Sequence, residues 1–128
     1  MRYWKFDVCQ LIRDFKSNKR TLTAIEENLY AARKFYNHPM GAESKGDWEK
    51  YIEVLELREA EYRSYVDMVI LGLQDLPEVE RLVLKWWLVD GWEDSAIVEH
   101  GGIKNNNELQ RIKKIALTKF RRFIVRKM

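Results

Sequence analysis

The sequence is poor in the residues that cross-link a chain or interrupt its helices. Its 128 residues include one cysteine, Cys9, and two prolines, Pro39 and Pro77. A lone cysteine cannot form an internal disulfide, and its place in a helical pattern indicates a small packed hydrophobe in a reducing compartment. No apolar run approaches a membrane span, and the N-terminus lacks the uninterrupted apolar region of a signal peptide. We therefore expect an intracellular protein without a membrane partner.

Residues suited to catalysis are also sparse. His38 and His100 stand far apart, and no group of Cys or carboxylate residues has the spacing of a metal site. Gly101-Gly102 lacks the preceding strand and the Lys-Ser/Thr of a phosphate-binding loop. The sequence therefore predicts no enzyme activity, no metal and no cofactor.

The composition favours an all-α fold. Hydrophobic residues make up 46% of the chain, and few stretches alternate apolar and polar residues as a half-buried strand would. A chain of this length can bury one modest core, or a small core beside an extended helical arm.

Charge is unevenly distributed. From Lys104 onward there are nine Lys or Arg residues and one acid, Glu108, whereas residues 1–103 hold 14 basic and 19 acidic residues. A basic segment on an acidic body usually meets a polyanion. Apolar residues recur in this segment at three- and four-residue steps: Leu109, Ile112, Ala116, Phe120 and Phe123. The spacing predicts a folded amphipathic helix that begins around Asn105–Asn107.

Two long helices are predicted in the N-terminal half. The first has apolar residues at heptad a and d positions, with Asn18 in the same seam: Val8, Leu11, Phe15, Leu22, Ile25, Leu29, Ala32 and Tyr36. It should end near Asn37, because the residue before Pro39 avoids helical geometry, and residues 38–46 should form a loop.

The second long helix should begin at Asp47, a good cap residue. Its seam, interrupted by Glu59, consists of Trp48, Ile52, Leu55, Tyr62, Val66, Val69, Leu73 and Leu76. The two seams can bury each other in an antiparallel hairpin, or each can pair with a second copy of the chain. Both arrangements stay open. We expect a hairpin or oligomerisation arm over residues 1–74 and a second domain over residues 75–128.

Shorter helices separated by glycines follow. A helix over residues 77–89 should start at Pro77 and end before Gly91, which should have a left-handed conformation. The residues expected on its inward face are Val79, Leu82, Val83 and Trp86. A helix over residues 93–100 should turn Ala96 and Ile97 inward. Trp92 is expected in the core, whereas Trp87 lies off the stripe and could face a partner. A short helix, a glycine turn and a helix with a polar start form the helix-turn-helix plan.

The stretch that carries this plan is LPEVERLVLKWWLVDGWEDSAIVEHGGI. Its motif positions are Leu76, Pro77, Arg81, Val83, Leu84, Gly91, Ile97, Val98, Gly102 and Ile103. In these residues and spacings it resembles the fourth conserved region of bacterial sigma factors. The whole chain resembles the ArpU/RinA-type late-transcription regulators of phages of Gram-positive bacteria. This resemblance implies a DNA-binding regulator in the cytoplasm of a bacterial host cell.

Two positions depart from the family pattern. Glu108 stands six residues after Gly102, where a hydrophobic residue is usual. Leu109 restores the pattern if the turn is one residue longer, and Asn105–Asn107 can absorb that residue because Asn tolerates capping and left-handed conformations. Val98 replaces the Ala that is common in the first helix. The register of base contacts is therefore left open.

The start of the basic helix supplies the candidates for base contacts, which are Asn105, Asn106, Asn107, Gln110, Arg111 and Lys114. Asn and Gln can pair bidentately with adenine, and Arg and Lys with guanine. For any single asparagine, capping or turn formation is the more ordinary role. Candidates for phosphate contacts, which set affinity and register, are Lys104, Lys113, Lys119, Arg121 and Arg122.

These observations predict a sequence-specific transcription regulator whose partner is double-stranded DNA. The resemblance implies RNA polymerase as a further partner and a late-gene activator as the role, and the N-terminal helices would serve a homo-oligomer or a polymerase surface. Two alternatives stay open. One is a DNA-recognition subunit of a phage packaging machine, similar to a small terminase. The other is a protein-interaction adaptor whose basic helix meets an acidic partner.

Overall fold

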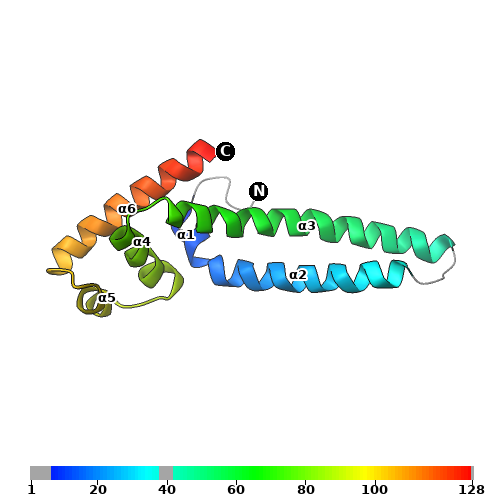
Figure 1. Ribbon diagram of the computed structural model, residues 1–128, viewed down its shortest axis with the longest axis horizontal. Helices are drawn as coiled ribbons and strands as arrows, with labels where there is room; N and C mark the ends of the chain where they lie inside the picture. Colours follow the sequence, from blue (N-terminus) through cyan, green and yellow to red (C-terminus); the bar gives the residue numbers. More distant parts are fainter. Residues whose placement is uncertain (1–6, 38–41, 128) are drawn as a thin grey trace. The chain divides into compact units, whose positions relative to one another are not determined.

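The computed structural model describes residues 7–37 and 42–127, and within them all regular structure is helical. The predicted all-α class is therefore confirmed. The elements are α1 (Val8–Arg13), α2 (Phe15–Tyr36), α3 (Ala42–Gln74), α4 (Glu78–Leu84), the π-helix η1 (Lys85–Val89), α5 (Asp94–Gly101) and α6 (Asn106–Lys127) (Figure 1). Among these residues, no helix combines the length and apolar character that crossing a membrane requires.

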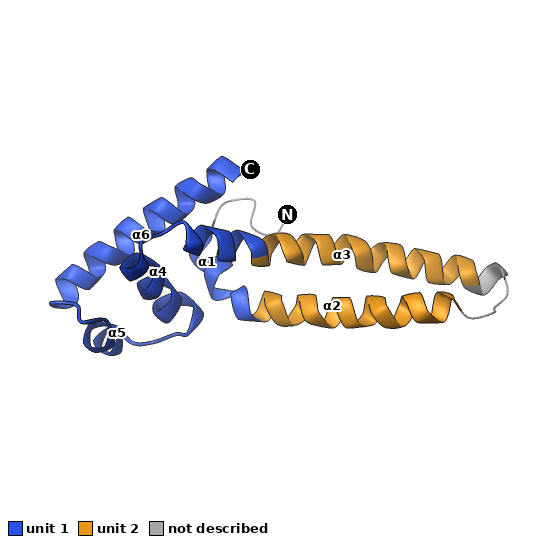
Figure 2. Ribbon diagram, viewed as in Figure 1, with its two compact units in different colours: residues 1–16, 67–128 blue, residues 17–66 orange. Residues whose placement is uncertain are grey.

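The helices belong to two compact units. Unit 1 contains residues 1–16 and 67–128, and unit 2 contains residues 17–66 (Figure 2). The expected domains over residues 1–74 and 75–128 stay a prediction. Within unit 1, α1 packs against η1 and α6, so that α1 shares a core with helices from the C-terminal part of the chain.

The first predicted helix is interrupted at Asp14, so its prediction as one continuous helix from Val8 was wrong. The Asp14 backbone N–H donates to the Gln10 carbonyl at 2.9 Å, and its carboxylate accepts from the Gln10 side chain at 2.8 Å. The break falls at an aspartate, a residue with low helix propensity. The Asp7 carboxylate caps the start of α1 by accepting from the Gln10 backbone N–H at 3.1 Å.

In unit 2, α2 and α3 lie side by side and run in opposite directions (Figure 1). One cluster contains members of both predicted seams, namely Ile25, Leu29, Ala32 and Leu55, with Trp48, Ile52 and Tyr62 packed against it. The Tyr36 hydroxyl donates to Glu49 at 2.8 Å. The pairing is therefore apolar along the seam and polar at its edge.

The ends of the two long helices are partly as predicted. Helix α2 ends at Tyr36, next to the expected end at Asn37. Helix α3 begins at Ala42, earlier than the expected Asp47, so residues 42–46 of the predicted loop are helical. Residues 38–41 of that loop lie outside the described residues. Asn18 is 1% exposed, in agreement with its place in the first seam.

The core of unit 1 joins α4, α5 and α6. Val83, Ile97 and Leu109 are fully buried in one cluster, and the partly buried hydrophobics packed against it are Trp86, Trp87, Trp92, Val98, Ile103 and Ile112. Farther along α6, Ala116 and Phe120 are also fully buried. Phe120 packs closely on Gly72 of α3, where an added Cβ would lie 2.4 Å from the ring. This contact requires glycine because a larger residue would displace a buried ring.

The helix predicted over residues 77–89 is α4 followed by the π turn of η1. The turn is closed by the Asp90 N–H, which donates to the Lys85 carbonyl at 2.9 Å. Gly91 has a φ of 70°, as predicted for a left-handed residue after the helix. Val79 is 53% exposed, so its predicted inward position was wrong. It lies in the first turn of α4, whereas burial is concentrated at the end of that helix.

Candidate functional site

The position of α6 is set by a glycine turn after α5. Gly102 has a φ of 63° and caps α5 in the left-handed conformation, which glycine adopts without steric cost. The Ile103 N–H donates to the Val98 carbonyl at 3.0 Å across this turn. Ile97 of α5 is fully buried, whereas Ala96 is exposed, contrary to its predicted inward position.

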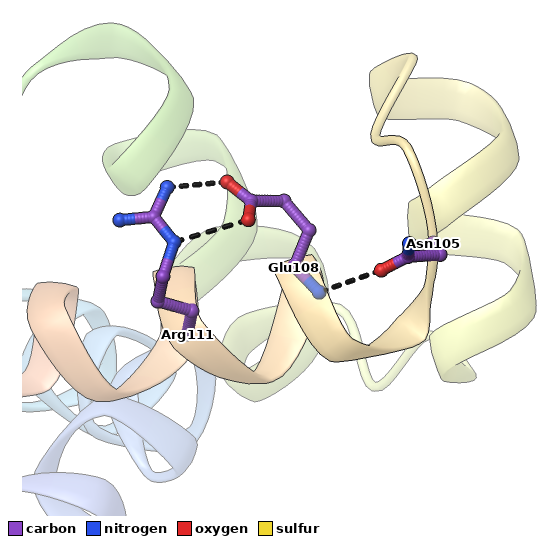
Figure 3. Close-up of polar contacts among 3 residues, drawn as sticks. All are labelled: Asn105, Glu108 and Arg111. Carbon is purple, nitrogen blue, oxygen red and sulfur yellow. Dashed lines mark hydrogen bonds and ion pairs between the residues drawn. The ribbon is translucent and has the colours of Figure 1, made fainter.

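Asn105 starts α6. Its side-chain oxygen accepts a hydrogen bond from the Glu108 backbone N–H at 2.9 Å (Figure 3). Its backbone carbonyl accepts from the Leu109 N–H at 3.1 Å. This is N-capping, which satisfies a donor that the helix cannot satisfy itself. Leu109 is fully buried and Glu108 is not, as a turn one residue longer requires.

The remaining base-contact candidates share the exposed side of the first turns of α6. Asn106, Asn107, Gln110, Arg111 and Lys114 are all exposed. Their three- and four-residue spacing places them along one side of the helix. The Gln110 side chain donates to Asp94 at 2.9 Å and to Asn106 at 3.2 Å. The helix therefore presents amide, guanidinium and ammonium groups together.

Arg111 is paired with Glu108 on its own helix. The Arg111 Nε donates to one carboxylate oxygen at 3.0 Å and Nη2 donates to the other (Figure 3). The hydrogen bond from Arg111 lowers the pKa of Glu108, and the same bond raises the pKa of Arg111. The charges of this pair largely cancel one another in the isolated protein.

Lys113 does not lie where a phosphate contact requires. It is 8% exposed, its Nζ is 2.6 Å from a carboxylate oxygen of Asp94, and it stands 4.3 Å from the centre of the Trp87 ring. Lys113 shares the buried stripe with Leu109 and Ala116, because residues four and three apart lie on one helix face. Its ammonium group therefore joins α6 to α5. We no longer regard Lys113 as a candidate for a phosphate contact.

The sequence did not predict the ion pair between Asp94 and Lys113. It also did not predict that the Trp87 ring would lie beneath the ammonium group of Lys113. The hydrogen bond from Lys113 lowers the pKa of Asp94, although burial opposes that shift. The sequence does hold one signal, since position 113 falls inside the apolar stripe of α6. Its partner could not have been identified from periodicity, because Asp94 lies on another helix.

The other phosphate candidates are exposed: Lys104, Lys119, Arg121 and Arg122. Lys119 also pairs with Glu80 of α4 at 3.0 Å. A hollow of about 720 Å³ lies beside the C-terminal half of α6, lined by Asp75, Thr118, Lys119, Arg121, Arg122, Val125 and Arg126. Four cationic side chains and one carboxylate give this hollow a positive charge, which suits an anion.

Two tryptophans and a histidine of unit 1 pack together. The rings of Trp86 and Trp92 are stacked with centroids 5.2 Å apart, and His100 meets each ring edge-on at 5.2 Å. Both tryptophans pack against the cluster around Val83, as predicted. Over residues 7–37 and 42–127, no group of three or more His, Cys, Asp or Glu residues could hold a metal ion.

No protein-family model, curated protein or solved structure matches the chain.

Proposed function

We propose that the protein is a sequence-specific DNA-binding transcription regulator whose α6 enters the major groove by its leading turns. In this proposal α4, α5, the turn at Gly102 and α6 form a helix-turn-helix module, and the paired helices of unit 2 form an arm. The supporting observation is the two-sided start of α6. Its outer side exposes Asn106, Asn107, Gln110, Arg111 and Lys114, while Leu109 anchors the same turns in the core.

The chemistry of the outer side suits base edges. The major groove is about 12 Å wide and admits one helix, and amide side chains can pair with adenine as guanidinium groups pair with guanine. Asn105 serves as the cap, so its amide contributes by fixing the first turn. The groups that would read bases are then the five exposed residues that follow it.

The cationic hollow is farther along the helix. At about 1.5 Å per residue, Thr118 to Arg126 lie roughly 18–30 Å from Asn106, beyond the width of the groove. Lys119, Arg121 and Arg122 therefore suit phosphates at or beyond the groove edge, and Lys104 suits phosphates beside the turn. Such contacts add affinity without reading sequence.

The resemblance to ArpU/RinA-type regulators makes late-gene activation in a phage or prophage the proposed role, without enzyme activity and in the host cytoplasm. RNA polymerase and a second copy of the chain are the proposed protein partners. Exposed apolar side chains in unit 2 support a protein contact there: Tyr30, Tyr51, Val54 and Leu57. An exposed apolar side chain of this size gains free energy when a partner covers it.

The test is selection of bound duplexes from a random pool with the purified protein. A protein that reads the groove enriches one motif. The logarithm of its binding constant for that motif falls with the logarithm of salt concentration at a slope of roughly −3.6 if four phosphates are contacted. The adaptor alternative is separated by this selection, and the packaging alternative by a transcription assay on a promoter that carries the selected motif. An adaptor yields no motif, whereas a packaging subunit enriches a motif but fails to change transcription from a promoter that carries it.

A further inference from the structure

Glu108 is the only acid in the segment from Lys104 onward, and it lies among the residues proposed to read bases. Its backbone position is fixed, because its N–H donates to the capping side chain of Asn105 at 2.9 Å. Its side chain is 36% exposed and that of Arg111 is 61% exposed. The pair is therefore at the surface that DNA would meet (Figure 3).

The carboxylate holds the donors that a base would need. Arg111 offers Nε and Nη2 to the two oxygens of Glu108. A guanidinium group reads guanine by a similar two-donor contact with O6 and N7. While Arg111 is bound to Glu108, these donors are not available to a guanine. Binding to a target therefore requires an exchange of partners.

We propose that Glu108 is a specificity-determining residue, which holds Arg111 until a guanine at the target site replaces the carboxylate. This inference rests on the proposed function. At the target, guanine supplies two acceptors in place of the two carboxylate oxygens, and the released carboxylate can accept from a cytosine amino group. At another sequence no such exchange occurs, and Arg111 stays neutralised by Glu108, so its charge adds little to the attraction by phosphates.

The pair should therefore weaken binding to random DNA more than binding to the target. The charge of Glu108 persists at neutral pH, because Arg111 and then Lys104 lower its pKa while burial opposes them only in part. An ordinary structural role makes a different prediction. A glutamate in the first turn stabilises a helix through the helix dipole, and its loss would change folding stability without changing sequence discrimination.

The experiment measures the ratio of dissociation constants for random and selected duplexes. It compares the full-length wild type with Glu108→Gln, Arg111→Ala, Arg111→Lys and the double variant Glu108→Gln/Arg111→Ala. Glu56→Gln is the matched control, since it removes the same charge from an exposed position on α3 in unit 2. We expect Glu108→Gln to lower the ratio at least about fivefold, the low end of a bidentate base contact, mainly by tighter binding to random DNA.

The other variants show whether Glu108 acts through Arg111. Arg111→Lys keeps the charge but loses the rigid planar fork that holds two acceptors at once, so it should also lower the ratio. In the Arg111→Ala background, Glu108→Gln should leave the ratio within twofold, as should Glu56→Gln in the wild type. Urea denaturation of each variant reports folding separately.

The outcomes separate the two proposals. A wild type that binds all duplexes equally contradicts DNA reading itself, and with it the role of Glu108. A wild type that discriminates, together with an unchanged ratio in Glu108→Gln, overturns only the role of Glu108. An equal drop in the ratio with and without Arg111 overturns the partner exchange.

Discussion

Replacing Asp94 with Asn tests the contact that joins α5 to α6. Asn keeps the shape of the side chain but removes the charge that faces Lys113 at 2.6 Å. Breaking a buried ion pair costs about 3–5 kcal/mol, whereas an exposed pair contributes at most about 1 kcal/mol. The Lys113 side chain is 10% exposed but that of Asp94 is 43% exposed, so solvent screens the pair in part. We expect a loss of about 1–2 kcal/mol.

The matched change is Lys113→Met. It removes the buried ammonium group, and Met can keep the packing on Trp87. Asp94 is exposed enough to be hydrated once its partner is gone, so this variant should be close to neutral in stability. Urea denaturation followed by tryptophan fluorescence measures both free energies of unfolding. A larger loss for Lys113→Met than for Asp94→Asn would refute this account of the pair.

The same pair gives a pH dependence. The hydrogen bond from Lys113, against the opposing effect of burial, leaves the pKa of Asp94 lower in the folded protein than in the unfolded chain. The pair therefore stabilises the fold above the unfolded pKa of an aspartate, and that stability is lost as pH falls through the folded pKa. The difference in the free energy of unfolding between wild type and Asp94→Asn should be largest at pH 7 and should disappear in acid. A difference in the free energy of unfolding that grows in acid would contradict a lowered pKa of Asp94.

Lys113→Met also tests the corrected position of this residue. If Lys113 contacted a phosphate, its loss would make the salt dependence of DNA affinity shallower by about 0.9 in slope. A lysine bound to Asp94 releases no counterion from DNA, so we expect the slope to be unchanged.

Four further changes have defined outcomes. Gly72→Ala should destabilise by about 1–2 kcal/mol, because the clash with Phe120 exceeds the gain in helix propensity. Gly46→Ala, with nothing within 4 Å of the added Cβ, should instead stabilise by up to about 1 kcal/mol, and calorimetry distinguishes the two signs. Asn105→Ala should cost about 1 kcal/mol in urea denaturation through loss of the cap, and no loss would mean that the cap is dispensable. Arg122→Ala should make the salt slope shallower by about 0.9, whereas Arg58→Ala, an exposed arginine of unit 2, should not.

Periodicity was sufficient to predict the all-helical class and much of the buried face of α6. Leu109, Ala116 and Phe120 recur at helical steps and are all fully buried. The rule works because one side of a helix must leave water, whatever it packs against. Gly91 was equally informative, since its positive φ follows from its place after a helix.

The remaining features depend on contacts between elements. Asp14 ends α1 within an otherwise continuous heptad pattern, because α1 packs in unit 1 while the seam of α2 packs in unit 2. The sequence predicts an exposed cation at Lys113, whereas the structure places its ammonium group against Asp94 and the Trp87 ring. Tyr65 is 1% exposed although it lies outside the predicted seam. Pairing of one helix with another decides these positions, and a single-helix pattern does not contain that information.

The measurement that tests the central claim most directly is amide chemical-shift mapping of the isotope-labelled protein with the selected duplex. The account predicts that the largest shifts fall on residues 104–114, with smaller ones around the cationic hollow at residues 118–126. Shifts confined to unit 2, with the start of α6 unchanged, would contradict the entry of α6 into the groove.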